Sequence, residues 1–167
     1  MRTGYGIPVA LRAAGKASTH MMRPRVLVVD DVAGVRDGLR TFLQRKGYEV
    51  ETAADALGAV RWIKRKSFEC ALVDMDLSPD AEMGMNGLDV VALLRIHQPG
   101  TRAILISASA DTALTRLALR RGAVARLEKP VDLAVLVGLL QHLAPPHEDT
   151  PGGNGAELLP AGPDRRP

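Results

Sequence analysis

Short apolar runs, each closed by a reactive side chain, recur along this chain and constrain its fold more than any other feature. Four of them have the length and β-branched composition of buried strands, and segments of helical period separate them. These runs cover residues 26–29, 71–73, 103–106 and 123–127, and a further strand is expected near 48–52. Strands that alternate with helices predict a parallel sheet with helices on both faces. We therefore expect a doubly wound α/β fold of five β/α units with the flavodoxin-like strand order 2-1-3-4-5.

Five amphipathic helices are expected between and after these strands, because apolar residues recur there at helical spacing. Their predicted limits are 33–46 for the first, 55–66 for the second, 111–121 for the fourth and 132–143 for the fifth. The third is expected to begin after Asn86-Gly87 and to end near His97. The residues expected to face the sheet include Val35 in the first helix and Leu133 in the last. Asp132 is the expected N-cap of the last helix.

The reactive side chains stand where the strands end. Asp30 and Asp31 follow the first strand, and Asp74 closes the third. Ser107 closes the fourth strand, and Lys129 comes just after the fifth. Ligands of open parallel sheets bind outside the carboxyl ends of the strands, so we expect these side chains to converge at one edge. Each alone has an ordinary alternative as a helix cap, a turn or a connection, but together they indicate Mg²⁺-dependent phosphoryl transfer to an aspartate.

The motifs at these positions resemble the receiver domain of two-component response regulators, over roughly residues 24–143. The residues that carry the resemblance are Val28-Val29-Asp30-Asp31, Leu72-Val73-Asp74, Asn86-Gly87, Ser107-Ala108 and Leu127-Glu128-Lys129-Pro130. The resemblance implies that Asp74 accepts a phosphoryl group from a histidine kinase or a histidine phosphotransfer protein. It also implies that Ser107 meets the phosphoryl group, and that Lys129 supplies a positive charge and precedes a cis bond to Pro130.

The resemblance further implies a Mg²⁺ ion at this edge of the sheet. Its ligands are the carboxylates of Asp30, Asp31 and Asp74 and the backbone carbonyl of Asp76. Mg²⁺ prefers hard oxygen ligands, which suits this set. A phosphoryl group adds charge and strong acceptors, so a hydroxyl drawn towards it is expected to shift the fourth helix and its loop.

The sequence departs from the family pattern in the loop after the acceptor strand. The family usually has a proline four residues after the acceptor and a glycine about eight after it. Here Pro79 is five residues on and Gly87 is thirteen residues on. The longer loop, residues 77–86, is acidic and contains methionines. It either gates access or contacts a partner, or it is a surface insertion that loop-closure entropy tolerates.

A second departure lies three residues before the lysine, where the family usually has an aromatic residue that couples to the movement of the hydroxyl. This chain has Arg126 there. We expect Arg126 to be an exposed, solvated side chain, and an arginine switch is the alternative.

Composition limits the class of protein. The formal net charge of +3 comes from 22 Lys and Arg against 19 Asp and Glu, and aromatic residues make up 3%, so nucleic-acid binding is not indicated. The only cysteine, Cys70, lies inside an apolar strand, which indicates a buried structural thiol and a cytoplasmic protein. No segment approaches the ~18 apolar residues of a membrane span. The basic residues Arg61, Lys64, Arg65 and Lys66 are expected to form a solvated helix end.

The two ends of the chain differ from its centre. Residues 1–22 are expected to be a disordered leader and residues 23–143 the receiver domain. Residues 144–167 hold six prolines and four glycines and are expected to be a disordered tail. We expect a stand-alone receiver that acts on a protein partner through its fourth helix, fifth strand and fifth helix. A homodimer through the same face is an alternative.

Two other functions are open. One is a receiver-like docking module that is never phosphorylated. The other is a phosphatase of the haloacid dehalogenase type, because Asp74-Met75-Asp76-Leu77-Ser78 resembles the first motif of those enzymes. Their nucleophile strand comes first in the chain, whereas here Asp30 and Asp31 precede it, and this order favours the receiver.

Overall fold

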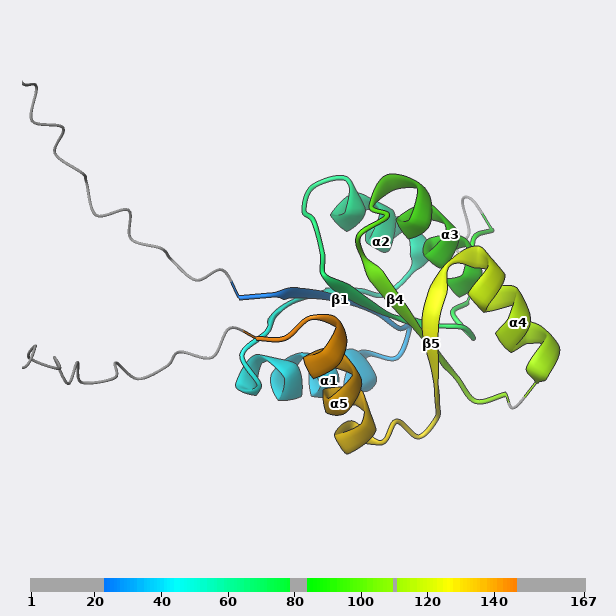
Figure 1. The fold of residues 1–167 in the computed structure, drawn as a ribbon. Coiled ribbons are helices and arrows are strands. Elements are labelled where there is room, and N and C mark those ends of the chain that lie inside the picture. Colours follow the sequence, from blue (N-terminus) through cyan, green and yellow to red (C-terminus); the bar gives the residue numbers. More distant parts are fainter. Residues whose placement is uncertain (1–22, 79–83, 110, 147–167) are drawn as a thin grey trace, which may run out of the picture.

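The computed structural model describes residues 23–78, 84–109 and 111–146, and they form a five-stranded parallel sheet in the order β2-β1-β3-β4-β5 (Figure 1). The strands are β1 (Arg25–Val29), β2 (Glu49–Ala53), β3 (Cys70–Asp74), β4 (Arg102–Ser107) and β5 (Ala123–Glu128). The helices are α1 (Ala33–Arg45), α2 (Ala56–Ile63), α3 (Gly87–His97), α4 (Thr112–Arg121) and α5 (Leu133–Leu143). The predicted fold class and strand order are confirmed.

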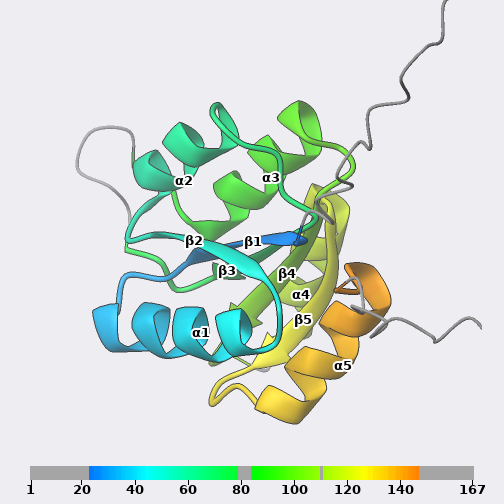
Figure 2. The same ribbon diagram turned by 90° about the vertical axis from the view of Figure 1, so that its left-hand side faces the viewer.

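The helices form one layer on each face of the sheet (Figures 1 and 2). Helices α2, α3 and α4 cover one face, where Leu27, Val73 and Leu105 are completely or almost completely buried. Helices α1 and α5 cover the other face, where Leu72 and Ile104 are equally buried. Because side chains alternate along a strand, each central strand feeds both apolar layers, as its continuous apolar sequence predicts.

Two residues expected to face the sheet do not do so. Val35 is 37% exposed and Leu133 is 41% exposed, so both predictions were wrong. Each lies in the first turn of its helix, next to the loops at the carboxyl edge of the sheet. The first turn of each helix therefore lies outside the sheet surface that buries the apolar residues of its later turns. Further along α1 and α5, Leu39 and Leu136 are buried as expected.

Side-chain caps begin four of the five helices. Asp132 accepts hydrogen bonds from the N–H groups of Ala134 and Val135, which confirms it as the N-cap of α5. The exception is α1, whose N-cap residue Val32 makes no side-chain cap. The acids that precede α1 are therefore not used as helix caps.

Other sequence predictions can be checked within the described residues. Cys70 is fully buried, and burial raises the pKa of its thiol to about 12, so it is a structural cysteine. Ala144 is also buried in the α1 and α5 layer, so the packed unit extends past the predicted limit at residue 143. The predicted leader 1–22 and the tail from residue 147 lie outside the described residues. None of the described helices is long and apolar enough to cross a membrane.

Candidate functional site

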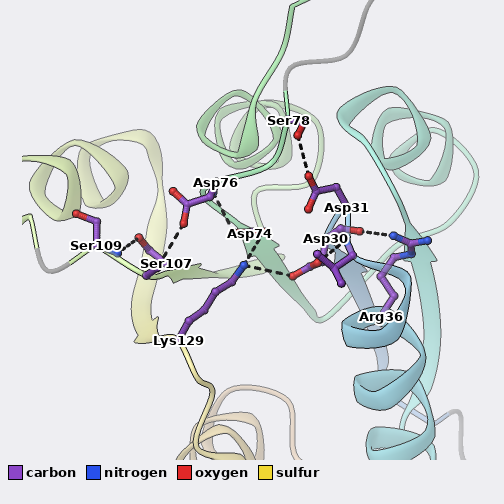
Figure 3. Close-up of polar contacts among 11 residues, drawn as sticks. Asp30, Asp31, Arg36, Asp74, Asp76, Ser78, Ser107, Ser109 and Lys129 are labelled. Carbon is purple, nitrogen blue, oxygen red and sulfur yellow. Dashed lines mark hydrogen bonds and ion pairs between the residues drawn. The ribbon is translucent and has the colours of Figure 1, made fainter.

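Three carboxylates meet at the carboxyl edge of the sheet, as the sequence predicts (Figure 3). Asp30 and Asp31 follow β1, and Asp74 ends the neighbouring strand β3. One oxygen of each lies within 4.8 Å of the others. Asp30 and Asp74 are each only 1% exposed, whereas Asp31 is exposed to solvent. The edge therefore has two buried acids behind one that faces outward.

Lys129 brings a positive charge to this cluster. Its Nζ lies 2.7 Å from Asp74 Oδ2 and 3.7 Å from Asp30 Oδ2. Burial disfavours the ammonium form, but the hydrogen bond to Asp74 and the charges of the neighbouring acids outweigh burial and raise the pKa of Lys129. The peptide bond from Lys129 to Pro130 is cis, as predicted.

Asp30 is the acid whose hydrogen bonding is incomplete. Its Oδ1 accepts a hydrogen bond of 2.8 Å from the N–H of Val32. Its Oδ2 is buried and accepts no hydrogen bond from the described residues. Burial raises the pKa of Asp30, and the charge of Asp74 adds to this effect. A buried carboxylate oxygen without a donor, beside two further acids, fits a divalent cation.

Asp31 is oriented by a residue that the sequence analysis did not single out. The hydroxyl of Ser78 donates a hydrogen bond of 2.8 Å to Asp31 Oδ2, and this bond lowers the pKa of Asp31 (Figure 3). Ser78 stands four residues after Asp74, at the position where the resemblance leads one to expect proline. A serine in place of that proline was the signal in the sequence that could have pointed to this contact.

Asp74 is held through both of its oxygens. Its Oδ2 accepts the hydrogen bond from Lys129, and its Oδ1 accepts one of 2.9 Å from the N–H of Asp76. The carboxylate of Asp76 turns the other way and accepts a hydrogen bond of 3.3 Å from the N–H of Ala108. Asp76 therefore links the end of β3 to the loop after β4.

Ser107 is buried at the end of β4, next to the acid cluster (Figure 3). Its Oγ accepts a hydrogen bond of 3.0 Å from the N–H of Ser109. Within the described residues, no hydrogen bond joins the Ser107 hydroxyl to Asp74. The structure thus brings together every site residue that the sequence predicted, with the serine turned towards its own loop.

Arg126 differs from its predicted state. Its side chain is half-buried, and its guanidinium donates a hydrogen bond to the backbone carbonyl of Ser109. The prediction of an exposed, solvated side chain was therefore wrong. The sequence does not contain this contact as a local signal, because it joins β5 to the loop that follows β4.

Comparisons with known proteins agree with this geometry. The family model described as the response regulator receiver domain matches residues 26–141. The chain belongs to the response regulator receiver family. This assignment excludes the phosphatase alternative.

The similar proteins include regulators of several kinds. This receiver is 35% identical over 115 residues to the alginate biosynthesis transcriptional regulatory protein AlgB of Pseudomonas aeruginosa, covering 68% of this chain and 24% of AlgB. It is 26% identical over 113 residues to sporulation initiation phosphotransferase F of Bacillus subtilis, covering 68% of this chain and 87% of that protein. The receiver spans about a quarter of the length of the AlgB proteins that it matches.

Solved structures show the same fold. A CheY-like receiver domain protein from Methanospirillum hungatei superimposes with a TM-score of 0.67 at 30% identity, covering 72% of this chain and 93% of that one. A response regulator from Burkholderia pseudomallei, determined with a phosphorylated aspartic acid, a calcium ion and citrate, gives a TM-score of 0.64 at 30% identity. It covers 71% of this chain and 66% of that chain.

In this receiver, the start of α3 lies directly against the end of β3. A Cβ atom at Gly87 would lie 2.0 Å from the carbonyl oxygen of Asp74, so only glycine fits there. Asn86 caps the helix, and Asp89 returns the bond in a capping box.

The long loop is described only at its ends, since residues 79–83 and with them Pro79 lie outside the described residues. Its role remains a prediction.

Proposed function

We propose that this receiver accepts a phosphoryl group on Asp74 from a phosphohistidine of a histidine kinase or a histidine phosphotransfer protein. The observation that carries the proposal is the state of Asp74 itself. Its carboxylate is buried and is fixed through both oxygens by Lys129 and by the N–H of Asp76. Phosphoryl transfer depends mainly on positioning and on neutralising charge. Both hydrogen bonds position the Asp74 carboxylate, and Lys129 also neutralises its charge.

The transfer exchanges one bond to phosphorus for another. An oxygen of the Asp74 carboxylate bonds to phosphorus while the bond from phosphorus to the partner's imidazole nitrogen breaks. The imidazole nitrogen keeps the electron pair of that bond. Lys129, which pairs with Asp74 before transfer, lies close enough to pair with the phosphoryl oxygens after it.

Asp30, Asp31 and Asp74 would hold a Mg²⁺ ion, together with the backbone carbonyl of Asp76. The three carboxylates lie close together, and the buried Oδ2 of Asp30 accepts no hydrogen bond from the described residues. When bound, Mg²⁺ supplies charge neutralisation for the phosphoryl oxygens. Ser78 and Val32 orient two of the three carboxylates towards this role.

Ser107 would donate a hydrogen bond to a phosphoryl oxygen on Asp74. It is buried on the strand next to the acceptor, and the β3 and β4 register pairs Asp74 with Ile106, the residue before it. Reaching the phosphoryl group requires the hydroxyl to leave the N–H of Ser109. The phosphoryl group adds about −1.5 to −2 charge, which makes this exchange favourable.

The surface around the site is suited to a protein donor. Val32 and Val35 are 52% and 37% exposed at the start of α1, beside the acid cluster. A donor protein that docks over the acid cluster would bury these two apolar side chains, which favours its binding. For the downstream partner we propose the face of α4, β5 and α5, where Leu119, Val124 and Val135 are exposed. A stand-alone mode of action stays a prediction.

The first test is the mass of the intact protein after incubation with phosphoramidate and Mg²⁺. We expect one added phosphoryl group on the wild-type chain and on Asp37→Asn, which changes an exposed acid on α1. Asp74→Asn and a sample with EDTA should show no adduct. If phosphoramidate and a panel of phosphorylated histidine kinases all fail to modify the wild-type chain, the docking-module function replaces this proposal.

A further inference from the structure

The loop after β4 is attached to the rest of the receiver by Arg126. Leu105 and Arg126 are partners in the parallel register of β4 and β5, so both side chains lie on the face that α4 covers. From there the guanidinium reaches the backbone carbonyl of Ser109. In the part of the chain that the structure describes, no carboxylate lies within ion-pair distance of Arg126. Among the described residues, the hydrogen bond to the Ser109 carbonyl is therefore the main polar contact of the Arg126 side chain.

Ser109 connects the site to α4 through its N–H group and its hydroxyl oxygen. Its N–H donates to Ser107 Oγ at 3.0 Å, and its own Oγ accepts a hydrogen bond of 3.1 Å from the N–H of Asp111. Asp111 is the N-cap of α4 and accepts bonds from Ala113 and Leu114. A movement of Ser109 therefore affects both the hydroxyl at the site and the first turn of α4.

We propose that Arg126 is a positioning residue that holds the Ser107 hydroxyl in its loop-facing orientation and so opposes its turn towards a phosphoryl group. This inference rests on the proposed function. When Ser107 Oγ moves towards Asp74, the N–H of Ser109 loses its acceptor unless the loop follows. The bond from Arg126 fixes the carbonyl of the same residue, Ser109, and prevents the loop from following. Arg126 thereby lowers the population of the phosphate-binding conformation.

The bond is suited to this role because it is a single directional contact. A guanidinium donates through fixed N–H groups, so a small displacement of the Ser109 carbonyl breaks the bond. Its free energy favours the present loop conformation only, and it therefore acts as a bias between two conformations. Removing the donor should shift that balance towards the conformation that binds phosphate.

The test measures the affinity of the Mg²⁺-loaded protein for beryllofluoride, a mimic of the phosphoryl group, by fluorine NMR. Arg126→Met removes the donor and keeps the apolar stem, and it should bind beryllofluoride roughly 3- to 10-fold more tightly than wild type, as expected for one hydrogen bond. Arg102→Met is the matched control, because Arg102 is an exposed arginine at the opposite end of β4. Its affinity should stay within about twofold of wild type.

A double-mutant cycle identifies the residue through which Arg126 acts. In a Ser107→Ala background there is no hydroxyl for the loop to hold. The added Arg126→Met change should then alter beryllofluoride affinity by less than about twofold. An effect of equal size in both backgrounds would overturn the proposal, since Arg126 would then act independently of Ser107.

The outcomes separate this inference from the function on which it rests. Unchanged or weaker binding by Arg126→Met, with normal binding by wild type, overturns the inference alone. Failure of wild type to bind beryllofluoride overturns the proposed function.

A further test uses the wild-type protein alone. Its Ser109 amide should exchange with solvent faster once beryllofluoride is bound, and equal or greater protection would contradict the proposal.

Discussion

The acid cluster at the carboxyl edge of the sheet and the residues around Gln98 at its amino edge differ in how far their polar groups are hydrogen-bonded. At the carboxyl edge, Asp30 Oδ2 is buried without a donor among the described residues, and Asp74 lies close to two other acids. At the amino edge, Gln98 satisfies several main-chain groups at once. Its Nε2 donates to the carbonyls of Ile63 and Lys66, each at 2.7 Å.

Around Gln98, the amino edge forms a closed network. Gln98 Oε1 accepts a hydrogen bond of 3.1 Å from the N–H of Phe68. The hydroxyl of Thr101, 8% exposed, donates at 2.7 Å to the carbonyl of Phe68. The chain between α2 and β3 and the chain between α3 and β4 are thus joined through two side chains. The network around Gln98 joins separate segments of the chain, whereas the buried Asp30 Oδ2 has no donor among the described residues, which suits the proposed cation site.

The largest expected effect comes from breaking the closed edge. Gln98→Ala leaves the carbonyls of Ile63 and Lys66 and the N–H of Phe68 without this partner. Because each such group costs about 1–3 kcal/mol and water reaches part of this edge, we expect a loss of about 2 to 3 kcal/mol in the free energy of unfolding. Urea denaturation measures it. Gln44→Ala, at an exposed position on α1, should change stability by about 0.5 kcal/mol or less.

This variant also tests whether the two edges are independent. On the proposed function, folded Gln98→Ala protein should accept a phosphoryl group on Asp74 to the same extent as wild type, because the acid cluster is at the opposite end of the strands. A stability loss below about 1 kcal/mol would contradict the structural role of Gln98.

A smaller effect of opposite sign is expected at the open edge. Asp30→Asn removes a buried charge, and without divalent cations it should raise the free energy of unfolding at neutral pH by on the order of 1 kcal/mol. Thermal unfolding in EDTA measures this gain. Added Mg²⁺ should stabilise wild type and not Asp30→Asn, because the variant lacks one ligand.

The gain in the free energy of unfolding from Asp30→Asn should increase as the pH rises. The pKa of Asp30 is raised above its ordinary value of 3.8 in the folded protein, mainly by burial. A raised pKa means that the stability contribution is present below the unfolded value and is lost as pH rises through the folded value. The wild-type and Asp30→Asn curves should therefore meet below about pH 4 and separate above it. A constant difference across that range would rule out titration of Asp30 as the cause.

The smallest effect is expected from the partly exposed ion pairs that Lys66 makes with two glutamates of β2. Lys66 Nζ lies 2.5 Å from Glu51 Oε1 and 3.2 Å from Glu49 Oε1. Surface pairs contribute little because water and side-chain entropy offset the attraction, so Glu51→Gln should cost about 0.5 kcal/mol or less. Urea denaturation at low and high salt measures this loss. A loss above about 1 kcal/mol would show that charge pairs, and not Gln98 alone, stabilise this edge.

The sequence by itself determined the sheet and the side chains at its open edge. Strand-like runs fixed which residues end each strand, and parallel strands bring their carboxyl ends together whatever the details of packing. Asp30, Asp74, Ser107 and Lys129 were predictable for that reason. The N-cap Asp132 was predictable too, because capping depends on residues next to one another in the chain.

Only the tertiary structure decided how those side chains are held. The exposure of Val35 depended on where α1 passes the edge of the sheet. The bond between Ser78 and Asp31 joins residues 47 positions apart, and the bond between Arg126 and Ser109 joins residues 17 apart. Local periodicity carries no information about such contacts, because they depend on loop paths and rotamers that are set when separate segments pack together.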